Sequence, residues 1–411
     1  MKAKSLGHRV TFVQARDVSL LRATATPDEQ ITAALEHVDR LVTVERLEAD
    51  LAGAVRRIDA DSPVHAVLTT SELAVLPTAH TAAALGLRTT PPDHLRQAVH
   101  KGECRTRLHR AGIRSPRHAT VTTVEQALDA ARELGFPLVA KPSRGVGKES
   151  TAIVGSESGL KEYFAGLRAQ RAARSTALDG FISTAIVLES YLEGVLYSAE
   201  IVAGGGDPRV LLVTRRERAA HNELFEVAAV MPAGLSPDES AAVETYMRGI
   251  FRELGLTVGV YHVEFIMTRE GPALVEINAR MMGGMSPFLY HHVTGTDPFE
   301  ILIREHLGEP LELPVPPFRR AGIVVAFSSV EGGVAPVDAE RRIAEVAAEY
   351  RPLRHSLAVR DGQPIAKMTG NFSVFGYFCL EAADAGAARA LGRELISDMG
   401  QALGLRLAEY R

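Results

Sequence analysis

The stretch that decides the fold reads Val263-Glu264-Phe265, then Leu274-Val275-Glu276-Ile277-Asn278-Ala279-Arg280, then Gly283-Gly284. Alternate residues of a β-strand point to the same face, so Glu276, Asn278 and Arg280 should share one face. The residues between them are apolar and should pack on the other face: Val275, Ile277 and Ala279. Acids that interrupt apolar runs in this way argue against the alternative of a solvated edge strand. Because magnesium takes one or two carboxylates together with substrate phosphates, the pattern predicts a nucleotide-metal site.

The composition is that of a globular protein with a hydrophobic core. The chain has 411 residues, 46% of them hydrophobic, and a formal net charge of −4. This length predicts two to four domains, and the balanced charge argues against nucleic acid as a partner. No apolar run approaches the roughly 18 residues of a membrane span, so we expect a cytoplasmic protein with no membrane partner. Cys104 and Cys379 lack the spacing of a disulfide framework or thiolate metal site and are expected in the core.

Residues 1–92 have the pattern of a small parallel α/β sheet. Strands separated by helices of about this length are typical of such sheets. The expected strands lie at 10–13, 41–44 and 64–69, and the expected helices begin near residues 28, 47 and 72. No GxGxxG follows the first strand, which argues against a dinucleotide domain.

Residues 93–190 are expected to form a linker helix and a small sheet. The expected elements are a helix over 93–110 that carries Lys101 and Arg105, strands at 118–121, 137–141 and 151–154, and a helix over 123–134. The loop Pro142–Ser150 contains Gly145 and Gly147, and such a backbone lets amide groups approach an anion closely. A plain glycine hairpin is the alternative, and Pro142 and Glu149 exclude a Walker loop.

Residues 191–318 are expected to form an antiparallel catalytic sheet, and residues 319–411 a small α+β lid. The expected strands lie at 186–190, 197–202, 210–215, 225–230, 258–267 and 273–277, with a helix over 236–254. Dense prolines at 310–317 mark a linker. The last portion should contain strands at 323–327 and 371–380 and a helix over 385–403.

These pieces, in this order, resemble the ATP-grasp superfamily, and most closely its carboxylate-amine ligases of the L-amino acid ligase type. The resemblance covers about residues 65–300 and is carried by Val139-Ala140-Lys141-Pro142, Leu188-Glu189-Ser190-Tyr191-Leu192-Glu193-Gly194, His262-Val263-Glu264-Phe265, and Glu276-Ile277-Asn278-Ala279-Arg280 with Gly283-Gly284. Each motif is weak alone, whereas their order and spacing are specific. The resemblance implies a multidomain ATP-grasp fold of class α/β and α+β.

The resemblance assigns the phosphate end of the ATP site. Lys101 and Lys141 would reach phosphate oxygens of ATP. The loop from Gly145 to Ser150, with Gly147 and Lys148, would close over them as a flap.

The resemblance also assigns the residues that would contact the adenine base and the metal ions. Glu189 would accept from the adenine amino group, and Tyr191 and Leu192 would form the hinge at the purine edge. Two Mg²⁺ ions, or Mn²⁺ in their place, would bind to Glu264, Glu276 and Asn278.

The remaining assignments concern the substrates. Arg280, beside Gly283 and Gly284, would steady the acyl phosphate and the tetrahedral intermediate. His262 shares a strand face with Glu264 and is a candidate substrate contact, with plain packing as the alternative. Glu226 is a candidate for holding an amino group, with cross-strand pairing as the alternative.

The sequence departs from the family pattern in two places. The flap usually carries serine and glycine where Lys148 and Ser150 stand, so Lys148 is a candidate for an added phosphate contact. Many relatives carry a glutamate where Leu196 stands, which leaves Glu193 or Glu200 as candidate ribose contacts; Glu200 as a surface strand residue is the alternative.

The reaction implied by the resemblance forms an amide or peptide bond. ATP would convert a carboxylate into an acyl phosphate, an amine would attack it, and ADP and phosphate would be released, in specialised metabolism. Family members are frequently dimers, so a homodimer is the expected assembly. Two alternatives stay open: a bicarbonate-dependent enzyme of the biotin carboxylase or purine carboxylase kind, and a nucleotide-binding regulatory module without turnover.

Overall fold

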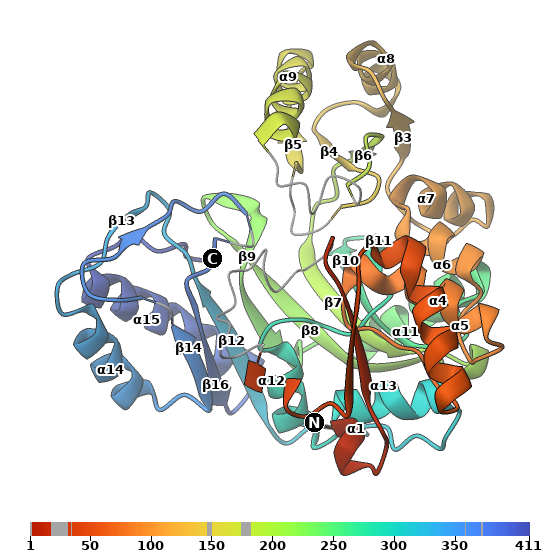
Figure 1. Ribbon diagram of the computed structural model, residues 1–411. Coiled ribbons are helices and arrows are strands. Elements are labelled where there is room, and N and C mark those ends of the chain that lie inside the picture. The colour runs from red at the N-terminus through yellow and green to blue at the C-terminus, as the bar shows by residue number, and fades with distance from the viewer. Residues whose placement is uncertain are drawn as a thin grey trace.

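The computed structural model arranges the chain around one long sheet, with a small sheet projecting from it (Figure 1). The structure describes residues 2–17, 32–33, 35–145, 150–173, 182–357, 359–370 and 373–411. Parallel pairing occurs near the N-terminus, and antiparallel sheets follow. The expected class of α/β combined with α+β is confirmed.

The N-terminal part is a short parallel sheet with helices on it. β1 (Thr11–Ala15) pairs with β2 (Arg40–Val44), and the helical elements are α1 (Lys2–Ser5), α4 (Leu47–Asp61), η1 (Glu72–Ala74) and α5 (Val75–Ala84). The helix expected near residue 28 would begin outside the described residues. The strand expected at 64–69 is not formed. Val64 and Val67 instead pack, without strand pairing, against a small apolar cluster of α4, so their hydrophobicity reflects packing rather than a ladder.

The expected helix over 93–110 is two helices. α6 (Pro92–Val99) ends at His100, whose φ of −84° and ψ of 103° are extended, and α7 (Lys101–Arg110) begins at the next residue. The break sets Lys101 at the first position of α7, with its backbone N–H donating to Ser143 O at 3.0 Å. The single-helix prediction was wrong because a one-residue break does not interrupt the helical pattern of apolar residues.

The small sheet has the strand order β3-β6-β4-β5 and is antiparallel throughout. Its elements are β3 (His118–Val121), α8 (Val124–Leu134), β4 (Leu138–Pro142), β5 (Ala152–Val154), α9 (Glu157–Ala173) and β6 (Ile186–Ser190). The Thr123 hydroxyl caps α8 by accepting from Gln126 N, and Gly135 (φ 79°) ends it, which agrees with the helix expected over 123–134.

The long sheet has eight strands in the order β11-β10-β7-β8-β9-β12-β16-β14. Its first five strands and their helices are β7 (Val195–Val202), η2 (Gly204–Gly206), β8 (Arg209–Ala219), β9 (Asn222–Met231), α11 (Pro237–Leu254), β10 (Val260–Thr268), β11 (Gly271–Asn278), α12 (Ser286–Thr294) and α13 (Pro298–Leu307). Ser236 and Glu239 form a capping box at the start of α11, and Gly255 (φ 65°) closes it.

The C-terminal residues extend the same sheet. They form β12 (Ala321–Phe327), β13 (Gly333–Val334), α14 (Ala339–Tyr350), β14 (Arg354–Leu357), β15 (Pro364–Ile365), β16 (Gly376–Ala382) and α15 (Ala385–Leu403). β12 pairs with β9 on one side and β16 on the other, so the part expected as a lid is joined to the sheet by backbone hydrogen bonds. β16 begins later than the expected strand at 371–380, whose first two residues lie outside the described ones.

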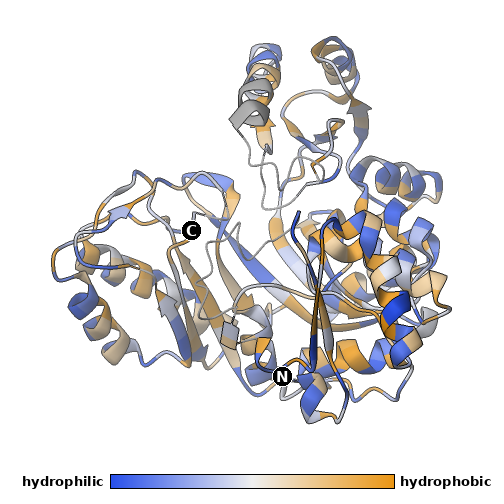
Figure 2. Cartoon of the chain, viewed as in Figure 1, coloured by the Kyte–Doolittle hydropathy of each residue, from blue (hydrophilic) through white to orange (hydrophobic). Residues whose placement is uncertain are grey.

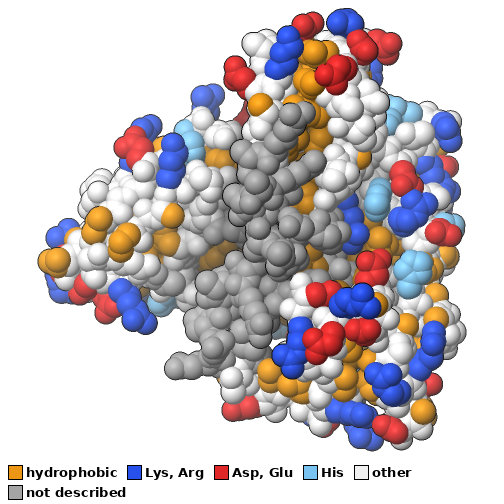
Figure 3. All heavy atoms as spheres, turned by 45° about the horizontal axis from the view of Figure 1, so that its top comes forward, with side chains coloured by type: hydrophobic (Ala, Val, Ile, Leu, Met, Phe, Trp, Pro, Cys, Tyr) orange, Lys and Arg blue, Asp and Glu red, His pale blue; other side chains and the backbone are white. Residues whose placement is uncertain are grey.

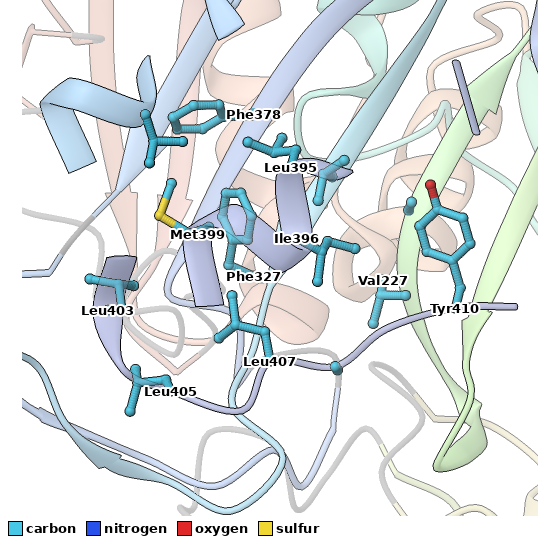
Figure 4. Close-up of a cluster of buried hydrophobic side chains, with 14 of the residues drawn as sticks. Val227, Phe327, Phe378, Leu395, Ile396, Met399, Leu403, Leu405, Leu407 and Tyr410 are labelled. Atoms are coloured by element: carbon cyan, nitrogen blue, oxygen red, sulfur yellow. The ribbon is translucent and has the colours of Figure 1, made fainter. Parts of the chain in front are cut away.

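An apolar core fixes this extension in place. Side chains of α15, including Leu395 and Met399, meet Phe327 of β12 and Phe378 of β16 (Figure 4). Figure 2 shows hydrophobic and hydrophilic colours along the strands of the long sheet, and the covering helices also carry both colours, as amphipathic helices require. The opposite half of the long sheet packs on α11, α6 and α7, and Lys101 and Arg105 of α7 contact the edge strand β11.

Candidate functional site

A cleft of about 900 Å³ lies between the small sheet and the long sheet. Its apolar lining comes from both: Val139, Ile153, Leu192, Leu196 and Ile266. Its polar lining is concentrated in Lys101, Lys141, Glu189, Arg218, Glu223 and Glu276. A cleft with apolar walls and a few convergent polar groups is the usual form of a small-molecule site.

Lys101 stands at one end of the cleft beside a carboxylate of β11. Its Nζ lies 3.0 Å from Glu276 Oε2, and both side chains are largely buried. Because Lys101 opens α7, the positive end of the helix dipole adds to its charge. The two together form a place where an anionic group of a ligand would be favoured.

Glu189 is a buried hub that holds two cations. Arg105 Nε lies 3.1 Å from Glu189 Oε1, and Lys141 Nζ lies 2.8 Å from Oε2. Burial opposes the charged carboxylate, but Arg105 and Lys141 outweigh it and lower the pKa of Glu189. Glu189 is 3% exposed and both of its oxygens are engaged, so here it fixes Lys141 at the cleft floor.

Sequence reasoning placed Arg105 on the helix with Lys101 but gave it no role. The two are one helical turn apart, so they lie on the same face of α7. That spacing was the available signal: Lys101 contacts Glu276, and Arg105 contacts Glu189.

A β-bulge shapes the floor of the cleft. Glu264 is paired with Glu276, and Phe265 is paired with Leu274, so Val275 is an extra residue in β11. Its carbonyl accepts from Arg105 Nη2 and, at 3.3 Å, from Lys141 Nζ. Val275 lines the cleft, so the expectation that it packs on the opposite face was wrong, because strand alternation fails at a bulge.

The expected metal ligands come together on one face of β10 and β11. Glu264 lies directly opposite Glu276, and His262 directly opposite Asn278. Directly opposed residues point to the same face, so two carboxylates and an amide are neighbours there. Asn278 Nδ2 lies 3.5 Å from Glu276 Oε1 and 3.3 Å from His262 O, which leaves its carbonyl oxygen for another partner. Within the described ranges, no group of three or more His, Cys, Asp or Glu side chains could hold a metal ion. The donor set of two carboxylates and one amide oxygen fits magnesium, which completes its shell with water and phosphate.

His262 is tied to two carboxylates. Its Nδ1 contacts Glu200 Oε1, and its Nε2 lies 3.7 Å from Glu264 Oε1. Burial lowers the pKa of His262, but Glu200 and Glu264 outweigh it and raise the pKa to about 9. Glu200 also accepts from Met282 N at 3.2 Å. Glu200 is therefore a buried residue that orients His262 and the turn after β11, and the surface-strand alternative was wrong.

Arg280 lies beyond the end of β11, so the prediction that it shares a strand face with Asn278 was wrong. Its Nη1 donates to Met281 O at 2.9 Å, and its Nε lies 3.1 Å from Glu72 Oε2. The N-terminal part thus contributes a carboxylate to this region that the sequence did not single out. The nearby Gly283 and Gly284 are exposed, and Gly284 has a φ of 61° in the turn that leads to α12.

Glu226 is paired across the strands with Arg216, whose Nε donates to Glu226 Oε2 at 2.6 Å. The cross-strand alternative is therefore the one observed. Burial disfavours the charged Arg216, but Glu226 first and Glu264 second outweigh it and raise its pKa. Arg216 consequently adds a guanidinium to the surroundings of Glu264.

The mouth of the cleft is bordered by the segment after β6. Tyr191 OH donates to Glu223 Oε1 at 2.7 Å, and burial together with Glu223 raises the pKa of Tyr191 to about 12. Leu192 lines the cleft beside it, as does Gly145 at the start of the expected flap. The other flap candidates, Gly147 and Lys148, lie outside the described residues.

Charges of both signs are mixed over the visible surface, with no extended field of one sign among the side chains shown (Figure 3). This agrees with the net charge of −4. None of the described helices has the length and apolar character needed to cross a bilayer.

Comparisons with known proteins agree with this geometry. A model described as an ATP-grasp domain matches residues 134–287, and one described as an ATP-grasp N-terminal domain matches residues 1–89. The carbamoyl phosphate synthase large chain of Vibrio vulnificus (strain CMCP6) is 27% identical over 262 residues, which is 62% of this chain and 23% of that protein. The chain therefore spans well under two thirds of the length of this relative.

Two solved structures share the fold. The L-amino acid ligase from Bacillus licheniformis has a TM-score of 0.76 at 21% identity and covers 100% of this chain and 95% of that chain. The biotin carboxylase domain dimer of the Hydrogenobacter thermophilus 2-oxoglutarate carboxylase, in complex with MgADP, ADP and bicarbonate, has a TM-score of 0.66 at 16% identity. It covers 100% of this chain and 87% of that chain.

Proposed function

The chain belongs to the ATP-grasp superfamily, and from this premise we propose that it is an ATP-dependent carboxylate-amine ligase. It joins an amino acid or a similar carboxylate to an amine and releases ADP and phosphate. The observation that carries the proposal is the contact of Lys101 with Glu276, because it joins the cleft to the face that carries Glu264 and Asn278.

ATP binds with its base in the cleft and its phosphates toward Lys101 and Lys141. The apolar walls suit a purine, and the segment of Tyr191 and Leu192 borders its edge. The ammonium groups of Lys101 and Lys141 are compact positive charges at the polar end of the cleft, and they offset the negative charge of the phosphates. The loop from Gly145 to Ser150 closes over the phosphates and excludes water.

The candidate ligands for magnesium are Glu264, Glu276 and Asn278. We propose that they bind two ions and that manganese can replace magnesium there. Magnesium, when bound, screens the charge of the transferring phosphoryl group. Lys101 lies 3.0 Å from Glu276 and neutralises its charge, and this contact holds the carboxylate at the position proposed for magnesium binding.

The reaction activates a poor electrophile. An oxygen of the carboxylate attacks the γ-phosphorus of ATP, the bond to the bridging oxygen breaks, and ADP leaves with that electron pair. The amine nitrogen then attacks the acyl carbon, the C–O bond to phosphate breaks, and the amine loses a proton. Arg280 stabilises the oxyanion of the tetrahedral intermediate, in which the charge has moved to oxygen.

The proposal extends to the location, assembly, metabolic role and domain division of the protein. The protein acts in the cytoplasm as a homodimer, in specialised metabolite biosynthesis. Its proposed parts are an N-terminal α/β domain (1–92), two linker helices with the small subdomain (93–190), a catalytic subdomain (191–318) and a C-terminal part (319–411) that extends the catalytic sheet.

The test is a screen of phosphate release. The purified chain is incubated with ATP, magnesium and all pairs of proteinogenic amino acids in bicarbonate-free buffer, and products of active pairs are identified by mass. We expect amine-dependent release with one ADP for each amide bond formed. Release that needs bicarbonate and ignores the amine would favour a carboxylase, the alternative that the Hydrogenobacter thermophilus structure suggests. Tight ATP binding with no turnover for any pair would favour a regulatory module.

Removal of divalent metal should stop the reaction without unfolding the protein. With EDTA in excess, amine-dependent ADP release should fall to background, because Glu264, Glu276 and Asn278 would then lack their ion. Added Mg²⁺ or Mn²⁺ should restore it. The thermal midpoint of the ATP-free protein should be the same with and without EDTA, and undiminished turnover in EDTA would contradict the metal assignment.

A further inference from the structure

Two charged side chains of the β8–β9 hairpin hold the hinge segment, residues 191–194, which follows β6. Tyr191 OH donates to Glu223 Oε1 at 2.7 Å, and Arg218 Nη1 lies 2.9 Å from Glu223 Oε2. Arg218 Nη2 also donates to the carbonyl oxygen of Gly194 at 2.6 Å. We call these contacts of Tyr191, Gly194, Arg218 and Glu223 the hinge latch, because they join both ends of the hinge segment to one hairpin.

The hinge segment also lies tightly against the long sheet. Gly194 has a φ of 149°, in the region that favours glycine, and a Cβ at this position would overlap the carbonyl oxygen of Met267 in β10. A larger residue would therefore force the segment away from β10. The backbone of the hinge segment is confined by β10 as well as by the latch.

The hairpin that carries the latch is anchored to the C-terminal part of the chain. Glu217, the residue before Arg218, is 4% exposed and contacts the guanidinium of Arg389 in α15. Ala220 N, in the turn between β8 and β9, donates to Glu409 O at 2.7 Å. Because of these contacts the hairpin is a fixed support, and the latch ties the hinge segment to it.

The latch borders the cleft at the place proposed for the edge of the purine. Tyr191, Arg218 and Glu223 all line the cleft. Adenine presents an amino donor and a ring-nitrogen acceptor at this edge, whereas guanine presents a carbonyl acceptor and an N–H donor there. A backbone held in one position can match one of these patterns and leave polar groups unpaired with the other, which is how such sites discriminate. A backbone that is free to shift discriminates less.

We propose that the hinge latch determines the selectivity for adenine nucleotides, by holding the backbone of the hinge segment where it pairs with the adenine edge. Arg218 and Glu223 are then positioning residues, which act through the hinge backbone. This inference rests on the proposed binding of ATP in the cleft. It adds that the selectivity for the base depends on a hairpin of the long sheet and on the C-terminal part that anchors it.

The test measures kcat/KM for ATP and for GTP with the most active substrate pair of the screen. Glu223→Ala removes the contacts with Tyr191 and Arg218. We expect it to lower kcat/KM for ATP by about tenfold, because the binding of ATP must then also fix the hinge segment. The loss should lie in KM, with kcat at saturating ATP changed less than about twofold. The kcat/KM for GTP should also change less than about twofold, so the selectivity falls about tenfold. Equal losses for ATP and GTP, or unchanged selectivity, would overturn the inference.

A direct contact of Glu223 with ribose would give a different result. The comparison uses 2′,3′-dideoxy-ATP, which keeps the base and lacks both ribose hydroxyls. Under the inference Glu223→Ala lowers kcat/KM for ATP and for this analogue by the same factor, because the base is the same. A loss for ATP alone would show that Glu223 binds the ribose, and the inference would then be wrong.

A double-mutant cycle tests whether the latch acts as a unit. Tyr191→Phe removes one hydrogen bond of the latch and should lower the selectivity in the same direction. The double variant should lose no more selectivity than Glu223→Ala alone, because the two changes remove the same contact. Additive losses would mean two separate roles and would contradict the inference.

Asp207→Ala provides the matched control for the loss of an ion pair on β8. Asp207 lies just before β8 and pairs with Arg209 Nε at 3.1 Å, and both side chains are more than half exposed. This variant should keep the wild-type selectivity. Glu223→Gln keeps an oxygen that accepts from Tyr191 OH, so it should retain part of the selectivity that Glu223→Ala loses. Thermal midpoints of all variants show whether they stay folded.

Failure of the ligase proposal can be distinguished from failure of this inference. If no substrate pair supports turnover, the ligase proposal fails, and the binding of ADP and of GDP to the wild type and to Glu223→Ala is measured by calorimetry. A preference of the wild type for ADP that falls in Glu223→Ala would still support the latch. An equal preference in the two proteins, or none in the wild type, would overturn it.

Discussion

Glu276→Gln should lower amine-dependent ADP release by about 10³-fold or more, while the protein stays folded. Glu276 contacts Lys101 and also faces Glu264 across the two strands. Glutamine keeps the shape of the side chain but removes the charge. It therefore weakens the oxygen donor for magnesium and releases the Lys101 ammonium at the same time. Initial rates with saturating ATP measure the loss of ADP release. Circular dichroism at matched protein concentration shows whether the variant stays folded.

Glu270→Gln provides the matched control. Glu270 lies in the turn between β10 and β11, is 79% exposed and pairs with Arg114 at 2.8 Å. The same chemical change in the same hairpin, but away from the cleft, should leave the rate unchanged. A Glu276→Gln protein that retains wild-type turnover and an unchanged magnesium requirement would rule out Glu276 as a metal ligand.

Much of the fold could be predicted because local signals and tertiary structure agree. α8, α11 and α15 begin and end where their caps and glycines indicate. The strands expected at 258–267 and 273–277 are formed and adjacent, and their register, which the sequence did not specify, sets Glu264 opposite Glu276. Such residues are informative because a polar group within an apolar strand is costly unless its position serves a purpose.

The errors arose where backbone geometry departs from a regular period. The bulge at Val275 turns the carbonyl toward Arg105 and Lys141, and strict alternation cannot anticipate it. The break at His100 leaves the apolar period intact, so one helix was predicted where there are two. Both irregularities border the cleft, where a regular element would not place these groups.

Contacts between residues that are distant in sequence could not be predicted either. Glu72 and Arg280 are brought together only by the packing of the N-terminal part on the long sheet. Likewise the contacts of Glu189 with Arg105 of α7 and Lys141 of β4 were not predicted, while its expected contact with adenine stays a prediction. Neither contact leaves a local pattern, because each needs two elements whose relative position is set by the whole fold.

Glu189→Gln should destabilise the protein by about 3–5 kcal/mol at pH 7, because it leaves two buried cations without their counter-charge. Arg105 is fully buried and Lys141 nearly so, and both are bound by this one carboxylate. Urea unfolding followed by fluorescence or circular dichroism gives the difference. Lys141 would no longer be fixed at the cleft, so the KM for ATP should rise as well.

The pH dependence of that difference identifies its electrostatic origin. The pKa of Glu189 is lower in the folded protein than the ordinary value of about 4.3, so its stabilisation is fully present above that pH. The stabilisation is lost as the pH falls further, toward the folded pKa, because a protonated carboxyl then resembles glutamine. The gap between wild type and Glu189→Gln should therefore be constant from pH 7 to 5 and narrow below about 4.3. Glu162→Gln, on the exposed surface of α9, should show no such gap. A gap that stays constant down to the acid transition would mean that lost packing, not lost charge, destabilises the variant.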